Sequence, residues 1–533
     1  MLKNNITFKV PTEYFSRYSK KIEKLLVILL CIISISFFYY YLINGLGLAY
    51  NDARSHLDIG RRVVEGLKPG LAQLGSVWLP LPHILMAPTI WNDFFWHSGL
   101  SGAIQSMASF IAVSVLIYKY LKKISVGLFG RVVAVLIFIT NLNILYLQST
   151  AMTELLLLAV ITASSYYFMV WYKEKKLLDL IKSAFWIMVS TAVRYDGWFL
   201  LFFVSLIIIY TTYKDKGYKE AEGTIILFAT LGGFAIALWF LWNLLIFRDP
   251  FYFVFGPFSA RTQQAQIESA GELFTKGSVY MSLKTYLYAV MYNTYTIPFI
   301  ISIFGAILFY KDKIRNFNIK VSTLALISPL IFNILALYLG HSVLFVKGIA
   351  GDTWFNVRYG MMMMPAVAIF IGILVDRMKD LRWVVVGLLL FVSVFSFINN
   401  DVVTIDDALI GASGKNVAEV SGWLKENVAD EDGFILISAA SHDAIIFSSG
   451  LPMKRFIHEG TGKYWEEAVE NPDLWARWII LRTNDMGDWT FREVNDAPGF
   501  NNFELVDHYP FADIYQLKSE FVDKVNTQPI LEQ

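Results

Sequence analysis

The sequence has little cysteine and little charge, and each shortage limits what the protein can be. Its single cysteine, Cys31, lies inside the first apolar run, so an intrachain disulfide is excluded. Charged residues make up 17% of the 533 positions and hydrophobic residues 56%, which leaves too little polar surface for one soluble globule. There is no internal repeat, and the run of four methionines at 361–364 is typical of ordinary membrane filling. The composition therefore indicates an integral membrane protein.

Apolar runs long enough to cross a bilayer core of about 30 Å recur between residues 25 and 400. They predict a mostly α polytopic bundle of about eleven spans. These lie near 25–46, 100–120, 126–147, 155–172, 177–193, 198–213, 224–247, 286–309, 321–340, 361–375 and 383–397. The first run follows a basic stretch, as a signal peptide would, but it is too long and lacks a small-residue cleavage site. We interpret it as a retained anchor.

The basic residues between the runs predict the orientation, because short loops rich in lysine and arginine stay cytoplasmic. With residues 1–24 inside, every predicted cytoplasmic loop is basic: 122–123, 173–176, 214–219, 311–320 and 377–382. The odd number of spans then places residues 401–533 outside. That segment holds 10 Lys+Arg and 24 Asp+Glu, net −14, whereas the remainder holds 35 and 20, net +15. We expect a multi-pass protein of the plasma (inner) membrane with an acidic extracytoplasmic domain.

Residues 401–533 alternate between helical and strand patterns, which predicts a small α/β domain beyond the bundle of residues 25–400. The helices are expected at 416–428 and 465–469, and buried strands at 433–438 and 478–481, with a terminal pair at 503–506 and 514–517. The stretch Gly460-Thr461-Gly462-Lys463 lacks the flanking residues of a phosphate loop. The acidity of the domain argues against nucleic acid as a partner.

Polar residues of the external loops would all lie on one membrane face, where they can converge on a single cavity. The long loops are 47–99, 248–285 and 341–359, and short ones carry Glu154 and Arg194. In the first loop, Asn51 or Asp52 has the character of a helix N-cap. An apolar stripe formed by Leu57, Val63, Val64 and Leu67 predicts that this helix lies along the bilayer surface and ends before Pro69-Gly70.

Four motifs in the predicted external segments carry a family resemblance. They are Asp52-Ala-Arg-Ser-His56 with Arg61, Gly66, Pro69-Gly70 and Trp78-Leu-Pro-Leu-Pro-His83; Ser149-Thr-Ala-Met-Thr-Glu154; Thr191-Ala-Val-Arg194-Tyr195-Asp196-Gly197; and Arg358-Tyr359 followed by Pro365. In order, spacing and sidedness the sequence resembles the GT-C superfamily of membrane glycosyltransferases, which includes protein O-mannosyltransferases and the aminoarabinose transferases of lipid A. It departs where many members carry two adjacent acids, at Asn51-Asp52-Ala53, and where the aminoarabinose transferases carry a lysine before the double proline.

The resemblance implies a hexosyl or pentosyl transferase that moves a sugar from a polyprenyl-phosphate donor to a hydroxyl of a protein, lipid or polysaccharide acceptor. A lipid phosphate leaves without a general acid, so one carboxylate suffices, unlike the pair needed in glycoside hydrolysis. Asp52 would be the general base of an inverting reaction. Cations would hold the phosphate. The substrate-binding candidates are Arg358 and Arg194, then Arg54, Arg61 and His83, with Tyr359 and Glu154 beside them.

No cofactor is firmly implied, although a divalent cation is compatible with the resemblance. Asp52 and His56 are four residues apart and would share one helix face, but no third ligand is obvious in the loop.

Each candidate residue also has an ordinary structural explanation. Asp52 could only cap its helix, and Arg358 could reach for the membrane interface as flanking arginines commonly do. Arg194 and Asp196 could satisfy each other, and Glu154 could complement a helix N-terminus. Among functions, a lipid-linked sugar flippase or transporter is an alternative, although it should show paired halves and acids deep in the membrane. An oligosaccharyltransferase-like enzyme with a pyrophosphate-linked donor is another, which the missing second acid disfavours.

Overall fold

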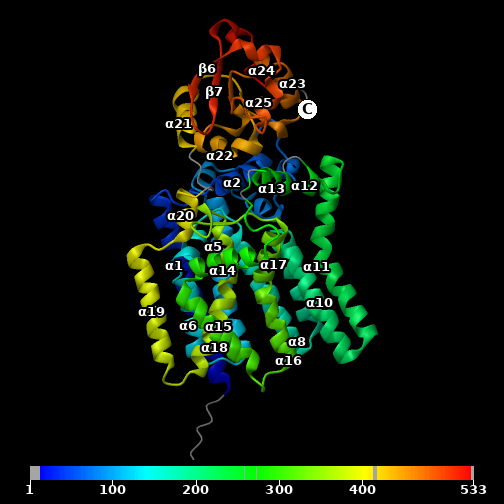
Figure 1. Ribbon diagram of the computed structural model, residues 1–533, viewed down its shortest axis with the longest axis vertical. Coiled ribbons are helices and arrows are strands. Elements are labelled where there is room, and N and C mark those ends of the chain that lie inside the picture. Colours follow the sequence, from blue (N-terminus) through cyan, green and yellow to red (C-terminus); the bar gives the residue numbers. More distant parts are fainter. Residues whose placement is uncertain (1–11, 257–258, 270, 272, 412–416, 530–533) are drawn as a thin grey trace, which may run out of the picture.

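The computed structural model describes residues 12–256, 259–269, 271, 273–411 and 417–529. A helical bundle carries a small α/β domain on one end (Figure 1). In the described residues, eight helices are long and apolar enough to cross a membrane. They are α1 (Thr12–Ile43), α5 (Leu100–Lys123), α8 (Glu154–Glu174), α10 (Asp196–Lys216), α11 (Tyr218–Phe247), α16 (Phe317–Ser322) with η2 (Thr323–Ile327) and α17 (Ser328–Leu339), η3 (Val357–Met363) with α18 (Met364–Arg377), and α19 (Arg382–Asn399) with α20 (Val403–Leu409). The predicted membrane bundle is confirmed.

The other three predicted spans are helical but short or bent. The run 126–147 divides into α6 (Leu128–Ile139) and α7 (Leu142–Leu147), because the side chain of Asn141 accepts a hydrogen bond from the Ile144 amide (3.0 Å) and starts a new helix. The run 177–193 forms α9 (Leu177–Thr191). The run 286–309 is not one straight span, because α14 (Val279–Thr294) and α15 (Thr296–Lys311) meet at 107° around Tyr295. The count of eleven stays a prediction.

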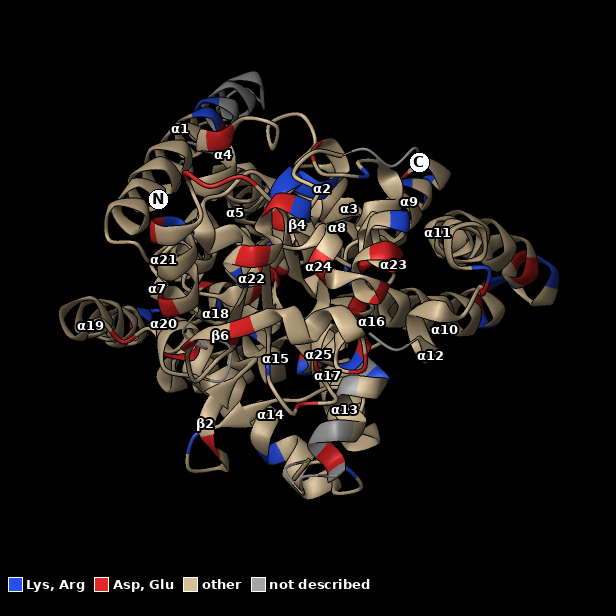
Figure 2. Cartoon of the chain, turned by 90° about the horizontal axis from the view of Figure 1, so that it is seen from above, with Lys and Arg blue, Asp and Glu red and all other residues tan. Residues whose placement is uncertain are grey.

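The basic loops meet at the end of the bundle that lies opposite the α/β domain. Lys123 pairs with Glu174, and Arg315 donates to the carbonyl of Ile124 (3.0 Å). Further contacts join Lys122 to Glu23, Arg377 to Asp312 and Asn318 to Asp215. The turn between α15 and α16 lies at this end in Figure 1, far from the domain. All the loops predicted to be cytoplasmic therefore lie on one side of the bundle. Seen from above, α19 and α11 stand at opposite flanks (Figure 2).

The C-terminal domain contains a five-stranded sheet in the order β4-β3-β5-β7-β6. Its strands are β3 (Ile435–Ile437), β4 (Phe456–Ile457), β5 (Trp478–Leu481), β6 (Phe503–His508) and β7 (Asp513–Leu517). The first three are parallel, with Leu436 paired to Ile479, and β7 runs antiparallel to β5 and β6. The predicted strands and the terminal pair are confirmed. The two-residue β4 is too short for a sequence period to indicate it.

Helices cover this sheet: α21 (Ala418–Asn427), α22 (Ala439–Ser449), α23 (Lys463–Glu470), α24 (Pro472–Trp475) and α25 (Trp489–Val494), with the short turns η5 (Met453–Arg455), η6 (Glu459–Thr461), η7 (Pro498–Asn502) and η8 (Ser519–Lys524). The predicted helix 416–428 corresponds to α21, and residue 416 itself lies outside the described residues. The predicted helix 465–469 lies within α23.

The first long loop holds α2 (Asn51–Val64), which lies between the bundle and the domain (Figure 1). That this helix lies along the bilayer surface stays a prediction, but its polar face is not turned to water. Asp58, Arg61 and Arg62 are buried, because this polar face packs against protein, with Arg62 3.3 Å from Asp443 of α22. The loop continues through η1 (Leu71–Leu74), α3 (Leu81–Ile84) and α4 (Asp93–His97). The other two long loops form α12 (Tyr252–Phe255) and α13 (Ala260–Ser269), and the hairpin of β1 (Phe345–Val346) and β2 (Ala350–Phe355).

Candidate active site

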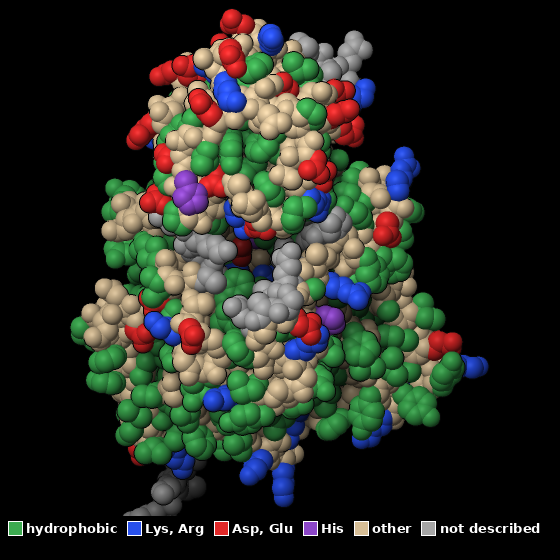
Figure 3. Space-filling model, turned by 45° about the horizontal axis from the view of Figure 1, so that its top comes forward, with side chains coloured by type: hydrophobic (Ala, Val, Ile, Leu, Met, Phe, Trp, Pro, Cys, Tyr) green, Lys and Arg blue, Asp and Glu red, His purple; other side chains and the backbone are tan. Residues whose placement is uncertain are grey.

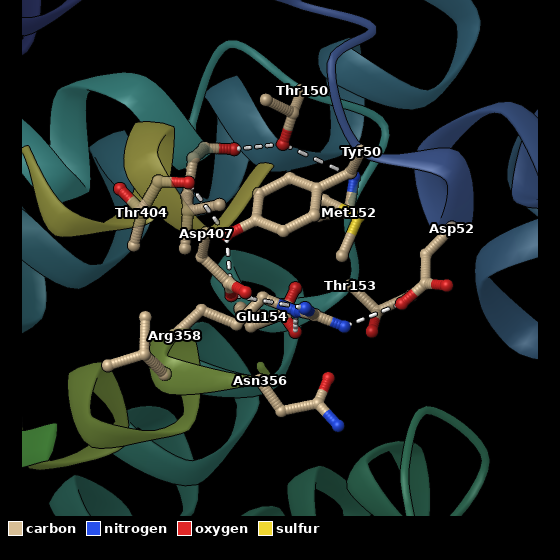
Figure 4. A network of polar contacts seen from close by, with 12 residues as sticks. Tyr50, Asp52, Thr150, Met152, Thr153, Glu154, Asn356, Arg358, Thr404 and Asp407 are labelled. Carbon is tan, nitrogen blue, oxygen red and sulfur yellow. Dashed lines mark hydrogen bonds and ion pairs between the residues drawn. The ribbon is translucent and has the colours of Figure 1, made fainter. Parts of the chain in front are cut away.

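Three carboxylates from distant parts of the chain face the guanidinium of Arg358 (Figure 4). Its Nη2 lies 2.5 Å from Oδ2 of Asp52, its Nε donates to Oε1 of Glu154 at 3.0 Å, and its Nη1 lies 3.6 Å from Oδ2 of Asp407. The Arg358 side chain is only 3% exposed. An arginine that reached for the membrane interface would keep its head in water. That explanation of Arg358 is therefore wrong.

Asp52 is the accessible member of this cluster. Its side chain is 39% exposed, whereas those of Glu154 and Asp407 are fully buried. The helix α2 begins one residue before Asp52, with Tyr50 at the N-cap position and no side-chain cap. The carboxylate points to Arg358 instead of to its own helix (Figure 4). The explanation of Asp52 as a cap is therefore wrong, and its carboxylate is both oriented and reachable.

Arg194 forms the second cationic part of the cluster. Its Nη1 lies 3.3 Å from the same Oε1 of Glu154 that Arg358 contacts, and its Nε lies 3.4 Å from Oδ2 of Asp196. Burial acts to lower the pKa of Arg194, but Tyr359, Asp196 and Glu154 together raise it above its ordinary value, so the guanidinium stays charged. The predicted pairing with Asp196 exists, but it is only one of the contacts of Arg194.

Aromatic rings pack on both guanidinium groups. The ring of Tyr359 lies 4.8 Å from Cζ of Arg194 and 5.4 Å from that of Arg358. The ring of Tyr50 lies 4.7 Å from Cζ of Arg358. Such cation–π contacts gain strength where water is excluded. They hold the two planar groups in fixed orientations beside Asp52.

Asp407 and Tyr50 belong to the cluster and were not predicted. The Tyr50 hydroxyl donates to Oδ2 of Asp407 (3.0 Å) and to the carbonyl of Thr404 (2.8 Å), both on α20. Burial and the Asp407 carboxylate raise the pKa of Tyr50 well above its ordinary value, so the phenol keeps its proton and acts as a donor. The helix α20 is thereby joined to the start of α2.

Arg54 and Arg61, the lesser cationic candidates, are tied to the first loop itself. Arg54 donates to the carbonyl of Leu48 at 2.9 Å. Arg61 pairs with Glu65 and with Asp93 (2.6 Å), and its guanidinium lies 4.6 Å from the ring of Trp96. Neither contacts Arg358 or Asp52 through any hydrogen bond or ion pair found among the described residues. Their contacts order the loop that carries Asp52.

His83 and His56 form a buried pair at the edge of the cluster. Nδ1 of His56 and Nε2 of His83 are 2.9 Å apart. Burial, with Arg194 and Arg358, lowers the pKa of His56 to about 3, and burial, with His56 and Arg62, lowers that of His83 well below its ordinary value. Both imidazoles are therefore neutral. His83 is nearly fully buried and carries no positive charge, so it does not supply a cation for a phosphate.

The residues do not form a ready metal site. Within the described ranges, no group of three or more histidine, cysteine, aspartate or glutamate side chains converges as metal ligands would. Asp52, Glu154 and Asp407 each face a guanidinium, and His56 is bound to His83. A divalent ion at Asp52 and His56 would have to displace these contacts.

The cluster includes residues of α2 and α20, which lie below the C-terminal domain at the end of the bundle away from the basic loops (Figure 1). A space-filling view shows a hollow between domain and bundle, with acidic and basic side chains in its depth (Figure 3). This is the concave, charged setting in which ligands commonly bind.

Comparisons with known proteins bear on the architecture. No protein-family model and no curated protein sequence matches the chain. Among solved structures, ArnT from Cupriavidus metallidurans is similar with a TM-score of 0.56 in the apo state (11% identity) and 0.54 bound to undecaprenyl phosphate (10% identity). Each alignment covers 93% of this chain and 99% of ArnT. The chain has a GT-C fold.

A second similar structure is the oligosaccharyltransferase of Archaeoglobus fulgidus, with a TM-score of 0.48, 11% identity, and 85% of this chain and 67% of that chain covered. The fold shared with ArnT was expected from the order, spacing and sidedness of the motifs, and the structure brings together the residues that carried the expectation. Asp52, Glu154, Arg194, Arg358 and Tyr359 come from four segments and meet in one cluster.

Proposed function

We propose that the protein is a membrane glycosyltransferase that uses a polyprenyl-phosphate-linked sugar and an acceptor hydroxyl, with Asp52 as the general base. One observation carries the proposal: an accessible carboxylate lies 2.5 Å from a buried arginine that two further carboxylates hold in place. It is supported by the GT-C fold shared with ArnT, which was crystallised with undecaprenyl phosphate.

The reaction follows from the chemistry of these groups. The acceptor oxygen attacks the anomeric carbon, the bond from that carbon to the phosphate oxygen breaks, and the acceptor proton passes to Asp52. The configuration is inverted because attack and departure are on opposite faces. The departing lipid phosphate gains negative charge, which Arg358 and Arg194 are suited to stabilise through charge-assisted hydrogen bonds.

Arg358 would also control when Asp52 acts as a base. Nη2 of Arg358 is bound to the Asp52 carboxylate. A bound phosphate would compete for the same guanidinium, and the carboxylate that it displaces would become free to accept a proton. Binding of the donor would thereby prepare the base.

We propose that the end of the bundle that carries Asp52, Arg358 and the C-terminal domain lies on the extracytoplasmic face of the membrane. The support is the position of the basic loops at the opposite end of the bundle and the net charge of −14 in residues 401–533. Protease added to spheroplasts, whose inner membrane is sealed and accessible, should remove the C-terminal domain, and protection of that domain would contradict the assignment.

Transfer by the purified protein is the decisive test. Radiolabelled polyprenyl-phosphate sugars and host membranes are incubated with the protein, with and without a chelator. We expect transfer, and we expect Asp52→Asn to lower its rate by about 10² to 10⁴, the usual contribution of a general base. Asp352→Asn is the control, because Asp352 is an exposed acid in the β1–β2 hairpin.

Retention of the full rate in Asp52→Asn would remove Asp52 as the base. Absence of transfer from every carrier, with translocation of the lipid-linked sugar across vesicles, would favour the transporter alternative. Transfer only from pyrophosphate-linked donors would favour the oligosaccharyltransferase-like alternative.

A further inference from the structure

The rings of His56, Trp78 and His83 form a wall near Arg194 and Arg358. These rings have no role in the reaction proposed above. His56 is four residues after Asp52 on α2, so the two side chains share a face of the helix. The His56 ring centroid is 4.3 Å from that of Trp78, and the His83 ring follows at 5.1 Å from His56. The wall therefore begins one helical turn from the proposed base.

Trp78 is held next to the turn that carries Arg194. The hydroxyl of Tyr195 donates to the carbonyl of Val77 at 3.3 Å, and the amide of Leu81 donates to the carbonyl of Ala192 at 3.1 Å. One bond holds the residue before Trp78 and the other holds a residue three positions after it. Trp78 itself remains partly exposed. The chain on either side of Trp78 is thus tied to the turn that carries Arg194.

His56 has one ring nitrogen committed and one available. Nδ1 is bound to His83, but no described residue makes a hydrogen bond to Nε2. Nε2 of His56 is not fully enclosed. Nδ1 of His83, in contrast, is fully enclosed and has no hydrogen-bond partner among the described residues. The side chain is otherwise nearly buried, at 5% exposure. A nearly buried polar atom that still reaches open space is placed to bind a ligand.

The chemistry of the wall fits a sugar ring. Both imidazoles are uncharged, as described above, so they add no charge that would attract a second phosphate. A sugar ring has C–H faces that pack on aromatic rings, and it has hydroxyl groups around its edge. Binding sites for such ligands combine an apolar or aromatic surface with a few fixed polar atoms. Trp78 supplies the first and Nε2 of His56 the second.

We propose that Trp78 and His56 form the subsite for the transferred sugar, with the indole packed on a C–H face of the ring and Nε2 of His56 hydrogen-bonded to one hydroxyl. The proposal rests on the proposed function, because the adjoining arginines would hold the phosphate of the same donor. In this proposal His56 selects between donors. A sugar with a free hydroxyl opposite Nε2 of His56 is transferred, and the analogue without that hydroxyl is transferred more slowly.

Two isosteric variants separate this role from the bond to His83. Asparagine places an amide near the position of Nδ1 and lacks Nε2, so His56→Asn keeps the bond to His83 and loses the proposed sugar contact. Glutamine places its amide near Nε2, so His56→Gln does the reverse. Polyprenyl-phosphate-linked mannose, glucose, galactose and arabinose are tested first, and the monodeoxy derivatives of whichever sugar is transferred are then compared.

We expect one monodeoxy donor to react about tenfold more slowly than its parent with the wild type and with His56→Gln. With His56→Asn the two donors should react at the same rate, mainly because KM for the parent rises about tenfold. Trp78→Ala should raise KM for the intact donor and leave the affinity for polyprenyl phosphate without a sugar unchanged.

Equal discrimination by His56→Asn and the wild type against every monodeoxy donor would overturn the subsite. Impairment of His56→Gln alone would also overturn the subsite, because His56 would then act only through its hydrogen bond to His83. If the wild type transfers and Asp52→Asn does not, either result leaves the proposed function intact. If the wild type transfers no sugar at all, both proposals fail together.

Discussion

Arg358 is the residue on which the geometry of the candidate site depends. A buried charge is costly unless it is paired, and removal of one partner leaves the others uncompensated. Glu154 and Asp407 are both fully buried, and Arg358 contacts each of them as well as Asp52. Loss of this side chain would therefore damage the fold and the chemistry at the same time. A test of its function needs a substitution that keeps the charge.

Arg358→Lys is that substitution. An ammonium group keeps the positive charge but cannot direct separate N–H groups to Asp52 and Glu154 as the planar guanidinium does. We expect transfer to fall by about 10- to 100-fold, which corresponds to roughly 1.4 to 2.7 kcal/mol of transition-state stabilisation, while thermal unfolding in detergent changes little. The control is Arg377→Lys, a half-exposed arginine paired with Asp312 at the opposite end of the bundle. Equal transfer by both variants would contradict a phosphate-binding role for Arg358.

At the scale of elements, the position of Arg358 is set by the packing of η3 on α14. Asn293 of α14 donates to the carbonyl of Val357 (2.7 Å), and the hydroxyl of Tyr286 donates to that of Tyr359 (3.1 Å). Gly360 of η3 lies against Ala289, which is between Tyr286 and Asn293 on α14. A Cβ on Gly360 would lie only 2.2 Å from the carbonyl oxygen of Ala289. Only glycine allows the two elements to meet at this distance.

Gly360→Ala should therefore push η3 away from α14 and move Arg358 relative to Asp52. Overpacking of this kind costs about 1 to 3 kcal/mol, so we expect a lower unfolding temperature together with a large loss of transfer. The matched control is Gly387→Ala in α19, where a Cβ would meet no atom within 4 Å and where alanine favours the helix by roughly 0.5 to 1 kcal/mol. Full activity of Gly360→Ala would show that the position of η3 is not critical.

The elements that sequence patterns predict well are those whose environment is uniform along their length. The strand β5 was predicted at its observed bounds because all four of its residues are buried. The breaks at Asn141 and Tyr295 were missed because mean hydropathy over a long run is insensitive to one polar or bent position. The burial of the polar face of α2 was missed because sequence does not distinguish a polar face turned to water from one turned to another domain.

The same reasoning applies to the candidate site. Asp52, Glu154, Arg194, Arg358 and Tyr359 could be selected from motif order and predicted sidedness, and they do converge. Asp407 could not, because it is one of several acids in a strongly acidic segment and nothing local marks it. Its significance comes only from the packing of α20 on the bundle, which places it beside Tyr50. The roles of all these residues in catalysis stay predictions.

At the scale of the whole molecule, the C-terminal domain is fastened to the loop that carries Asp52. Besides the pair of Arg62 and Asp443, the backbone amide of Met453 donates to Glu65 (3.2 Å). Asp58 lies beside Asp443 and accepts a hydrogen bond from Trp96 (3.1 Å), and it is fully buried. Two carboxyl groups and one guanidinium therefore share an enclosed interface, so the docking of the domain depends on their protonation.

This interface predicts a pH dependence with a definite sign. Burial, followed by the adjacent Asp443, raises the pKa of Asp58 well above its ordinary 3.8, and burial raises that of Asp443 to about 6, although Arg62 opposes both shifts. Glu459 is the other acid that faces Asp443, and its carboxylate also raises the pKa of Asp443. The folded protein thus holds protons that the unfolded chain releases above about pH 4, so the stability that this pair contributes falls as pH rises from there through pH 6 and on through the pKa of Asp58.

We therefore expect the carboxyl pair to raise the unfolding temperature of the C-terminal domain at pH 5 relative to pH 7.5 in detergent, whereas the buried His458, with its lowered pKa, acts in the opposite direction. Asp58→Asn replaces one carboxyl by a neutral amide that can still accept the bond from Trp96. The difference between the two pH values should shrink in this variant, because only Asp443 is left to titrate and Arg62 is its partner. Asp496→Asn, an exposed acid outside the interface, should keep the wild-type difference. An unchanged difference in Asp58→Asn would mean that the enclosed carboxyl pair does not govern docking.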